Sequence, residues 1–296
     1  MKIAVTGANS SVGRNLLSHI AARDDVTAVA GVRSEQAAGS LPTSDNIAPK
    51  VISYSEPVAL DEAFAGVDSV VHLAGILFES RGSSYQSANV QSTASVVRAA
   101  ERAGVSHLLF ISVIGADAAS ANAYLRSKGE AEQLVSDSAM ATTIIRTPML
   151  MGPDTAAGQS VAASVRDGRA KLLGGGRYTL RPLDIDDLSR AVLQACQHPP
   201  ENSQLYELVG PEPVRYRDLL ERAAQLKGKK LQVTSAPIWL ARLFAGIRYR
   251  IRREGLSPAI IDVITADEVT TDKAVGDPAM RLTPLSETLE KTIRKV

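Results

Sequence analysis

The sequence predicts an α/β fold, a doubly wound parallel sheet with a smaller C-terminal substrate lobe. Short apolar runs alternate with helical patterns along residues 1–150, and the first run, at 2–6, stops at Gly7. This alternation is typical of parallel strands joined by helical crossovers, with helices on both faces of the sheet. After Pro148 the pattern gives way to segments interrupted by glycine and proline, which indicate a second and less regular lobe.

The individual elements follow from hydrophobic periodicity. We expect strands at residues 2–6, 26–32, 51–52, 69–73, 107–113 and 142–146, and helices at 12–20, 59–64, 87–103 and 122–135. A helix at 184–196 and a strand at 205–209 complete the series. We therefore expect a core domain at 1–150, to which 184–210 returns. Residues 151–183 and 211–296 are expected to form the smaller lobe, which selects the substrate at the carboxyl edge of the sheet.

The composition excludes several classes of protein. The 296 residues include 45% hydrophobic and 22% charged side chains, which is the balance of a soluble globular protein. A net charge of +1 argues against nucleic acid as a partner. The single cysteine, Cys196, excludes an internal disulfide and a thiolate metal cage, so we expect no metal site. The chain has no apolar run of ~18 residues and no secretory signal pattern, and a cytoplasmic location is expected.

A glycine loop follows the first strand directly. Its sequence is Gly7-Ala-Asn-Ser-Ser-Val-Gly13, and an amphipathic helix begins at its end. Gly7 permits a tight turn, Gly13 permits close packing of helix on strand, and the helix N-terminus attracts phosphate. The pattern favours a dinucleotide pyrophosphate bound here, although an ordinary strand-to-helix turn also uses such glycines.

The segment from Thr6 to Gly13 resembles the TGAxGxxG fingerprint of extended and atypical short-chain dehydrogenases/reductases (SDRs), with Ser10 in place of the middle glycine. The resemblance includes the epimerase/dehydratase-like and NmrA-like groups and implies a Rossmann-type fold that binds NAD(P). The residues expected to hold the cofactor in this loop are Gly7, Asn9, Ser10, Ser11, Val12 and Gly13.

The end of the second strand indicates which cofactor is preferred. An acidic residue there would bind the ribose of NAD, whereas an arginine accommodates the 2′-phosphate of NADP. This chain has Arg33 and no acid before Glu35. We therefore expect NADP, held by Arg33 together with Arg14, rather than NAD. The alternative is that Arg33 is a solvated loop cation.

The segment from Asp68 to Gly75 resembles the fourth-strand motif of the SDRs. In that family the motif forms the wall of the adenine and ribose pocket, which implies that Leu73, Ala74 and Gly75 lie along the dinucleotide. His72, inside the same strand, is expected to be a core histidine rather than a ligand or catalyst.

A Tyr and a Lys four residues apart, Tyr124 and Lys128, match the YxxxK motif of the SDRs. Residues at this spacing share a helix face, and a nearby cation would lower the pKa of the phenol. The resemblance implies that Tyr124 exchanges a proton with the substrate and that Lys128 also holds the nicotinamide ribose. It further implies that Ser112 and Asn89 complete the catalytic group. Alternatively, the motif is an exposed helix turn.

Two alternatives concern Ser112 in particular. It could cap the end of the strand at 107–113 instead of acting on a substrate, and Ser120 could take its catalytic place. Ser112 lies at the end of the expected strand, and Ser120 lies between that strand and the helix that carries the YxxxK motif.

The resemblance extends over nearly the whole chain. It is strongest to the branch that contains the nucleotide-binding accessory subunit of respiratory complex I, some members of which bind NADPH without catalysis. The leading hypothesis is an NADP-dependent oxidoreductase acting on a carbonyl or hydroxyl group of an unidentified small molecule. The alternatives are a non-catalytic NADPH-binding assembly or regulatory protein, and a sugar-nucleotide epimerase or dehydratase.

Residues 237–254 predict a basic amphipathic helix in the second lobe. Large apolar residues from Trp239 to Ile247 recur at helical spacing and are followed by an arginine cluster. One interpretation is attachment to an anionic membrane surface or to a protein partner. The alternative is a lobe helix that packs its apolar face on the substrate cleft and leaves a solvated arginine face.

Overall fold

The computed structural model describes residues 1–252, 255–270 and 280–294. Its contacts divide the chain into two compact units. Unit 1 consists of residues 1–76, 84–146 and 188–207, and unit 2 consists of 77–83, 147–187 and 208–296. The sequence-based boundaries, 1–150 with 184–210 against 151–183 with 211–296, are retained as a proposal for two separately folding domains.

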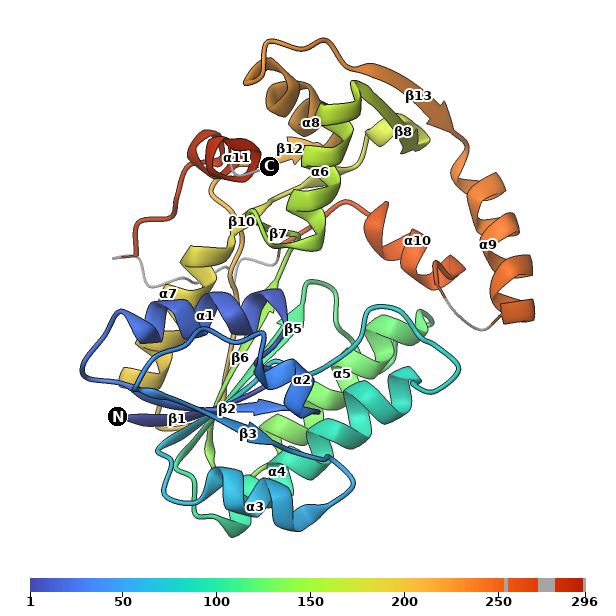
Figure 1. Cartoon of the computed structure of the whole chain (residues 1–296). Helices are drawn as coiled ribbons and strands as arrows, with labels where there is room; N and C mark the ends of the chain where they lie inside the picture. Colours follow the sequence, from blue (N-terminus) through green and yellow to red (C-terminus); the bar gives the residue numbers. More distant parts are fainter. Residues whose placement is uncertain (253–254, 271–279, 295–296) are drawn as a thin grey trace. The chain divides into compact units, whose positions relative to one another are not determined.

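Unit 1 is built on a parallel sheet of seven strands in the order β11-β6-β5-β4-β1-β2-β3 (Figure 1). The strands are β1 (Lys2–Thr6), β2 (Thr27–Val32), β3 (Ile47–Val51), β4 (Ser69–His72), β5 (His107–Val113), β6 (Ala141–Thr147) and β11 (Gln204–Glu207). From β1 the chain adds strands first on one side and then, starting with β4, on the other. The doubly wound fold that the sequence predicts is confirmed, and its switch point lies between β1 and β4.

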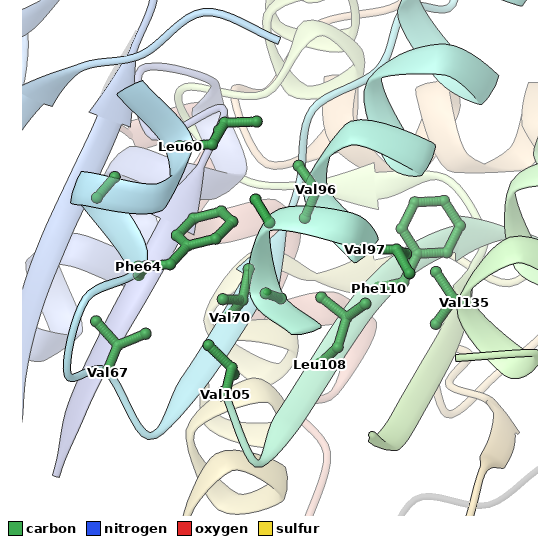
Figure 2. Packing of buried hydrophobic residues seen from close by; sticks show 14 of the residues in the cluster. Leu60, Phe64, Val67, Val70, Val96, Val97, Val105, Leu108, Phe110 and Val135 are labelled. Atoms are coloured by element: carbon green, nitrogen blue, oxygen red, sulfur yellow. The ribbon is translucent and has the colours of Figure 1, made fainter. Parts of the chain in front are cut away.

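The helices of this sheet are α1 (Ser11–Ala21), α2 (Glu35–Ala38), α3 (Pro57–Phe64), α4 (Ser92–Arg102), α5 (Ala123–Ser136) and α7 (Ile185–Gln197), the last of which begins in unit 2. Figure 2 shows the core beneath α3, α4 and α5, in which Val97, Phe110 and Val135 lie together and Phe64 belongs to the same cluster. Because each of these side chains is removed from water, the burial fixes α3, α4 and α5 on one face of the sheet.

The helix expected at 87–103 has a different start. Its first part, Gln86–Gln91, is a π-helical turn that runs into α4. The Ser92 hydroxyl donates to the carbonyl oxygen of Ala88 at 2.6 Å, and the Thr93 hydroxyl donates to that of Asn89 at 2.6 Å. Such bonds from side chains to the preceding turn compete with the backbone ladder, which accounts for the widened turn.

Unit 2 contains α6 (Ala156–Asp167), α8 (Tyr216–Gln225), α9 (Ile238–Arg252), α10 (Pro258–Ile264), α11 (Leu285–Arg294) and short two-stranded sheets. The short sheets pair β7 (Leu150–Met151) with β10 (Leu183–Asp184), β9 (Thr179–Leu180) with β12 (Val214–Arg215), and β8 (Arg169–Leu173) with β13 (Gln232–Ala236). Apolar side chains from α6, α8 and α11 form its main core. None of the helices in the described ranges is long and apolar enough to cross a membrane.

The acidic segment at 184–187 has a structural role in unit 2. Asp184 is fully buried and accepts hydrogen bonds from the Lys291 ammonium at 2.6 Å and the Thr288 hydroxyl at 2.7 Å. Asp187, also fully buried, accepts from the backbone and the hydroxyl of Thr283, each at 2.7 Å. Since a buried carboxylate needs such partners, these bonds attach the C-terminal helix to the segment.

Candidate cofactor and active site

The loop after β1 makes backbone contacts that only glycine permits. Gly7 has a φ of +69°, and a Cβ atom there would lie 3.0 Å from the backbone nitrogen of Ala74. A Cβ atom on Gly13 would lie 2.4 Å from the carbonyl oxygen of Ala8. The N–H of Leu73 donates to the carbonyl of Thr6, so the residues after β4 run beside this loop. The expected cofactor residues at 7–13 and 73–75 therefore meet at the switch point of the sheet.

Ser10 fits the loop without strain. Its φ of −67° and ψ of 164° are extended, and its hydroxyl oxygen accepts the N–H of Gly13 at 3.0 Å as the N-cap of α1. The N–H groups of Ser11 and Val12 have no acceptor within the helix, because they belong to its first turn. An N-terminus of this kind binds phosphate, so the loop fits a dinucleotide with serine in place of the middle glycine.

The two arginines expected near the 2′-phosphate have different surroundings. Arg14 donates to the carbonyl oxygen of Asn9 at 2.7 Å and thereby braces the glycine loop. Arg33 is exposed just beyond β2, and its positive charge acts on the phenol of Tyr54. Burial nevertheless raises the pKa of Tyr54 to about 12, so this phenol stays neutral beside the cation.

His72 is a buried structural residue, as the sequence predicts. Its Nδ1 lies 2.6 Å from the Thr6 hydroxyl and its Nε2 lies 3.0 Å from the Thr93 hydroxyl. Thr93 gives its own proton to the carbonyl oxygen of Asn89 and must accept from His72. This assigns the proton to Nε2, while Nδ1 accepts from Thr6. Burial lowers the pKa of His72 to about 3, with a smaller effect of the Lys128 charge.

Asn89 joins the loop after β4 to α5. Its Oδ1 accepts the N–H of Ile76 at 2.8 Å, and its Nδ2 donates to the Ser127 hydroxyl at 3.0 Å. Ser127 in turn donates to the carbonyl oxygen of Tyr124 at 2.7 Å. A Cβ atom on Gly75 would lie 3.1 Å from Asn89 Oδ1, so glycine gives the amide room. Asn89 thus positions backbone on both sides, and no pattern in the sequence had marked Ser127 as its partner.

Tyr124 lies in the first turn of α5, which Asn122 caps by accepting the N–H groups of Tyr124 and Leu125. The phenol is 7% exposed, and its ring centroid lies 5.6 Å from that of Tyr85. Burial, and then the neighbouring Tyr85, raises the pKa of Tyr124 above the ordinary value of 10.0. The sequence-based expectation of a lowered pKa is wrong for the described chain, because loss of solvation outweighs the effect of any nearby cation.

Lys128 lies against β5 through two contacts. Its Nζ donates to the carbonyl oxygen of Ile111 at 2.8 Å and lies 4.1 Å from the ring centroid of Phe110. Burial lowers the pKa of Lys128 to about 8, and the Glu132 carboxylate opposes this shift. Ser112 follows Ile111 in β5 and is buried. The structure therefore brings Lys128 to the strand end that carries Ser112.

Ser120 has a different role in the described chain. Its hydroxyl oxygen accepts the N–H of Asn122 at 3.2 Å in the turn before α5. Ser112, in contrast, is 1% exposed on β5, and its neighbour Ile111 holds Lys128. This placement favours Ser112 over Ser120 as the hydroxyl of the candidate site.

Gly129 and the ion pair between Arg146 and Glu132, which the sequence did not indicate, fix residues 116–118 before α5. A Cβ atom on Gly129 would lie 2.1 Å from the backbone nitrogen of Ala118, so the segment packs directly on the helix. Arg146 donates to both oxygens of Glu132, at 2.9 and 2.6 Å, and to the carbonyl of Ala116 at 2.7 Å. The sequence could have indicated this close packing, because Gly129 follows the YxxxK motif directly.

A doubly wound sheet with a glycine loop at its switch point, followed by a Tyr and Lys pair, defines an SDR-type dinucleotide-binding protein. Residues 7–174, more than half of the 296-residue chain, match the model of the NAD(P)H-binding family. The chain belongs to this family and is of the extended SDR type.

Two curated relatives cover most of the chain. A 4-hydroxy-2-methyl-3-oxo-4-farnesyl-3,4-dihydroquinoline-1-oxide ketoreductase from Stigmatella aurantiaca is 27% identical, over 83% of this chain and 79% of the relative. The mitochondrial NADH dehydrogenase [ubiquinone] 1 alpha subcomplex subunit 9 of Arabidopsis thaliana is 24% identical, over 95% and 72%. Among solved structures, the Citrobacter sp. triphenylmethane reductase has a TM-score of 0.75 at 20% identity, covering 99% of this chain and 100% of that one. At 20% identity, the similarity to the triphenylmethane reductase structure shows a shared fold alone.

We expect Gly13→Ala to weaken NADPH binding at least tenfold, which is about 1.4 kcal/mol. The new Cβ atom would lie 2.4 Å from the carbonyl oxygen of Ala8. This clash can be relieved only if the backbone at Ala8 or at Gly13 moves, which would open the loop. Titration of NADPH fluorescence measures the effect. Gly39→Ala is the control, because its Cβ meets nothing closer than 3.6 Å. An unchanged affinity of the Gly13 variant would contradict the assigned loop.

We expect His72 to make the free energy of unfolding fall in acid. Its folded pKa of about 3 lies below the ordinary 6.5, so below pH 6.5 the unfolded chain takes up a proton that the folded chain excludes. Stability is therefore lost as the pH falls from 6.5 toward 3, by about 2 kcal/mol between pH 6.5 and 4.5. Urea denaturation of His72→Gln should show a correspondingly shallower pH dependence, whereas exposed His198→Gln should match the wild type. Equal slopes for all three proteins would refute the assignment.

Proposed function

We propose that the protein is an NADP(H)-dependent oxidoreductase that reduces a carbonyl group of a small-molecule substrate. The observation that carries the proposal is the hydrogen-bonded link from Asn89 through Ser127 to the backbone of Tyr124. This link joins the loop at the end of β4 to the helix that carries Tyr124 and Lys128. Membership of the NAD(P)H-binding family supports the cofactor.

The residues that would hold the cofactor come from two neighbouring strand ends. The N-terminus of α1, at Ser11 and Val12, is assigned to the pyrophosphate. Leu73, Ala74 and Gly75 are assigned to the ribose and adenine side, where small residues leave room for the nucleotide. Lys128 is assigned to the nicotinamide ribose. NADPH supplies the hydride when it is bound.

The proton chemistry follows from the environment of Tyr124. Burial raises the pKa of this phenol, so it is protonated at neutral pH and is suited to donate a proton to the carbonyl oxygen. Lys128, with a pKa of about 8, is still mainly charged at neutral pH and favours negative charge nearby. Ser112 would donate a hydrogen bond to the same oxygen. This combination favours reduction, because oxidation would require the phenol to give up its proton first.

The substrate class is proposed from the relative with the ketoreductase name. That protein is named for a ketone on a farnesylated quinoline ring, and the similarity covers 83% of this chain. We propose a ketone on an apolar ring system as the substrate class of the present protein. Cyclic aromatic ketones and quinones are therefore the first compounds to screen with NADPH.

We expect Tyr124→Phe to lower kcat/KM for an accepted ketone by about 10² to 10⁴, the usual contribution of a general acid. The dissociation constant of NADPH should change less than twofold, because the ring and its contact with Tyr85 are kept. Steady-state kinetics and cofactor titration measure the two quantities. Tyr206→Phe, on the edge strand β11, is the matched control. Full activity of the Tyr124 variant would exclude the proposed acid.

We expect Arg33→Gln to weaken NADPH binding about tenfold and to leave NADH binding unchanged, because only NADPH carries a 2′-phosphate. Arg33 is exposed, so the substitution is not expected to disturb folding. Titration of both cofactors measures the ratio, with exposed Arg98→Gln as the control for loss of a surface cation. Wild-type protein that binds NADH as tightly as NADPH would overturn the proposed preference.

A second candidate function is a non-catalytic NADPH-binding protein that acts in assembly or regulation. It is favoured by the contacts of the Lys128 ammonium with the Ile111 carbonyl oxygen and the Phe110 ring, which already engage this group within the protein. Tight NADPH binding with no turnover across the ketone screen, in wild type and Tyr124→Phe alike, would select it.

A further inference from the structure

Helix α9 presents its large apolar side chains to solvent. The exposed fractions are 67% for Trp239, 53% for Leu243, 63% for Phe244, 52% for Ile247 and 74% for Ile251. At ~100° per residue these positions cover one arc of ~140° around the helix. Trp239, Leu243, Ile247 and Ile251 recur at every fourth residue and form a continuous strip along it.

The opposite side of α9 includes small residues and contacts the rest of unit 2. Ala245 is 8% exposed, and a Cβ atom on Gly246 would lie 3.5 Å from Pro258 at the start of α10. The Tyr249 hydroxyl donates to Glu79, which attaches the helix on this side. α9 is drawn beside α10 in Figure 1. The helix is therefore attached on this side, while Trp239, Leu243, Phe244, Ile247 and Ile251 stay more than half exposed.

The sequence left open that α9 packs its apolar face on the substrate cleft and leaves a solvated arginine face. Within the described part of unit 2 these side chains are not packed away from solvent, because each is more than half exposed. The end of the expected segment, Arg253 and Glu254, lies outside the described residues.

The charges on α9 are all positive. Its sequence, residues 238–252, contains arginines and no acidic residue. Arg242 pairs with Asp262 of α10 at 3.1 Å. Arg248 and Arg250 are exposed. At ~100° per residue, Arg248 lies ~40° beyond Phe244 at one edge of the apolar arc, and Arg250 lies ~20° inside the other edge, beside Trp239. An apolar strip bordered by cations is complementary to a surface that is apolar inside and anionic at its boundary.

We propose that α9 is a membrane-surface helix that lies in the headgroup layer of an anionic lipid bilayer. The apolar strip inserts beneath the headgroups, and Arg248 and Arg250 contact lipid phosphates. A bilayer accounts for the observations better than a protein partner does, because the exposed arc holds no neutral hydrogen-bonding side chain except the Trp239 indole. Tryptophan is itself typical of the bilayer interface. The proposal is independent of catalysis and of the cofactor.

Trp239 is the only tryptophan of the 296-residue chain and reports on the proposed surface directly. Full-length protein is mixed with vesicles of phosphatidylcholine alone or with one quarter phosphatidylglycerol. With the anionic vesicles we expect a blue shift of tryptophan emission, protection from acrylamide quenching and co-sedimentation. Binding should weaken as salt is added, because the arginine contribution is screened.

Two sets of variants separate the apolar and charged contributions. Leu243→Glu combined with Ile247→Glu should lower the vesicle partition coefficient more than tenfold, because both side chains would enter the apolar layer. Arg248→Gln and Arg250→Gln should each lower it about fivefold on anionic vesicles. Val58→Glu, 67% exposed on α3, and exposed Arg98→Gln are matched controls and should bind like the wild type. Thermal unfolding followed by circular dichroism verifies that every variant is folded.

Three results would overturn the proposal. The first is no tryptophan shift with anionic vesicles. The second is equal binding to neutral and anionic vesicles. The third is a blue shift that develops with protein concentration in the absence of lipid, together with dimer formation in sedimentation velocity, which would assign the surface to a second copy of the chain.

Discussion

A chain of buried hydrogen bonds from the cofactor loop to the candidate catalytic helix is the constraint on which unit 1 depends. It runs from Thr6 to His72, from His72 to Thr93, from Thr93 to the carbonyl of Asn89, and from the Asn89 amide to Ser127, with lengths from 2.6 to 3.0 Å. Each member is buried, so each loses water and must be satisfied by its neighbour. A displacement of β1, β4, α4 or α5 relative to the others would break a link, and the chain therefore fixes the candidate site geometrically.

The same burial explains the acid–base properties of the site. Loss of solvent favours the neutral form of every group, so it raises the pKa of Tyr124 and lowers those of Lys128 and His72. His72 stays neutral across the physiological range and acts as a fixed donor and acceptor. Burial lowers the pKa of Lys128 only to about 8, because the Glu132 carboxylate opposes the loss of solvation, so the amine stays mainly charged near neutrality. Tyr124 and Lys128 lie one turn apart on α5, and a protonated phenol together with a charged amine can stabilise negative charge forming on a carbonyl oxygen.

The sequence predicted the sheet and the glycine loop because both depend on local pattern. Short continuous apolar runs define the strands, which are buried on both faces of the sheet. Gly7 has a positive φ, and a Cβ atom on Gly13 would meet backbone at 2.4 Å. The π-helical turn at Gln86–Gln91 was not predictable from periodicity, because it depends on hydroxyl bonds to preceding carbonyls. The direction of the Tyr124 pKa shift was missed for a related reason. The spacing of the motif indicates a cation close in sequence, whereas the pKa is raised by burial and by Tyr85, which is distant in the chain.

Helix α9 carries large apolar side chains at positions where they do not stabilise its own fold. The inward face, with Ala245 and Gly246, needs only small residues, and Tyr249 and Arg242 already attach the helix through Glu79 and Asp262. Large apolar residues on the outward face add nothing to this packing, since they contribute to stability only when water is removed from them. Polar residues would serve folding and solubility better at these positions. The stability of unit 2 does not require the exposed strip, and this supports the proposal that the strip contacts a surface outside the chain.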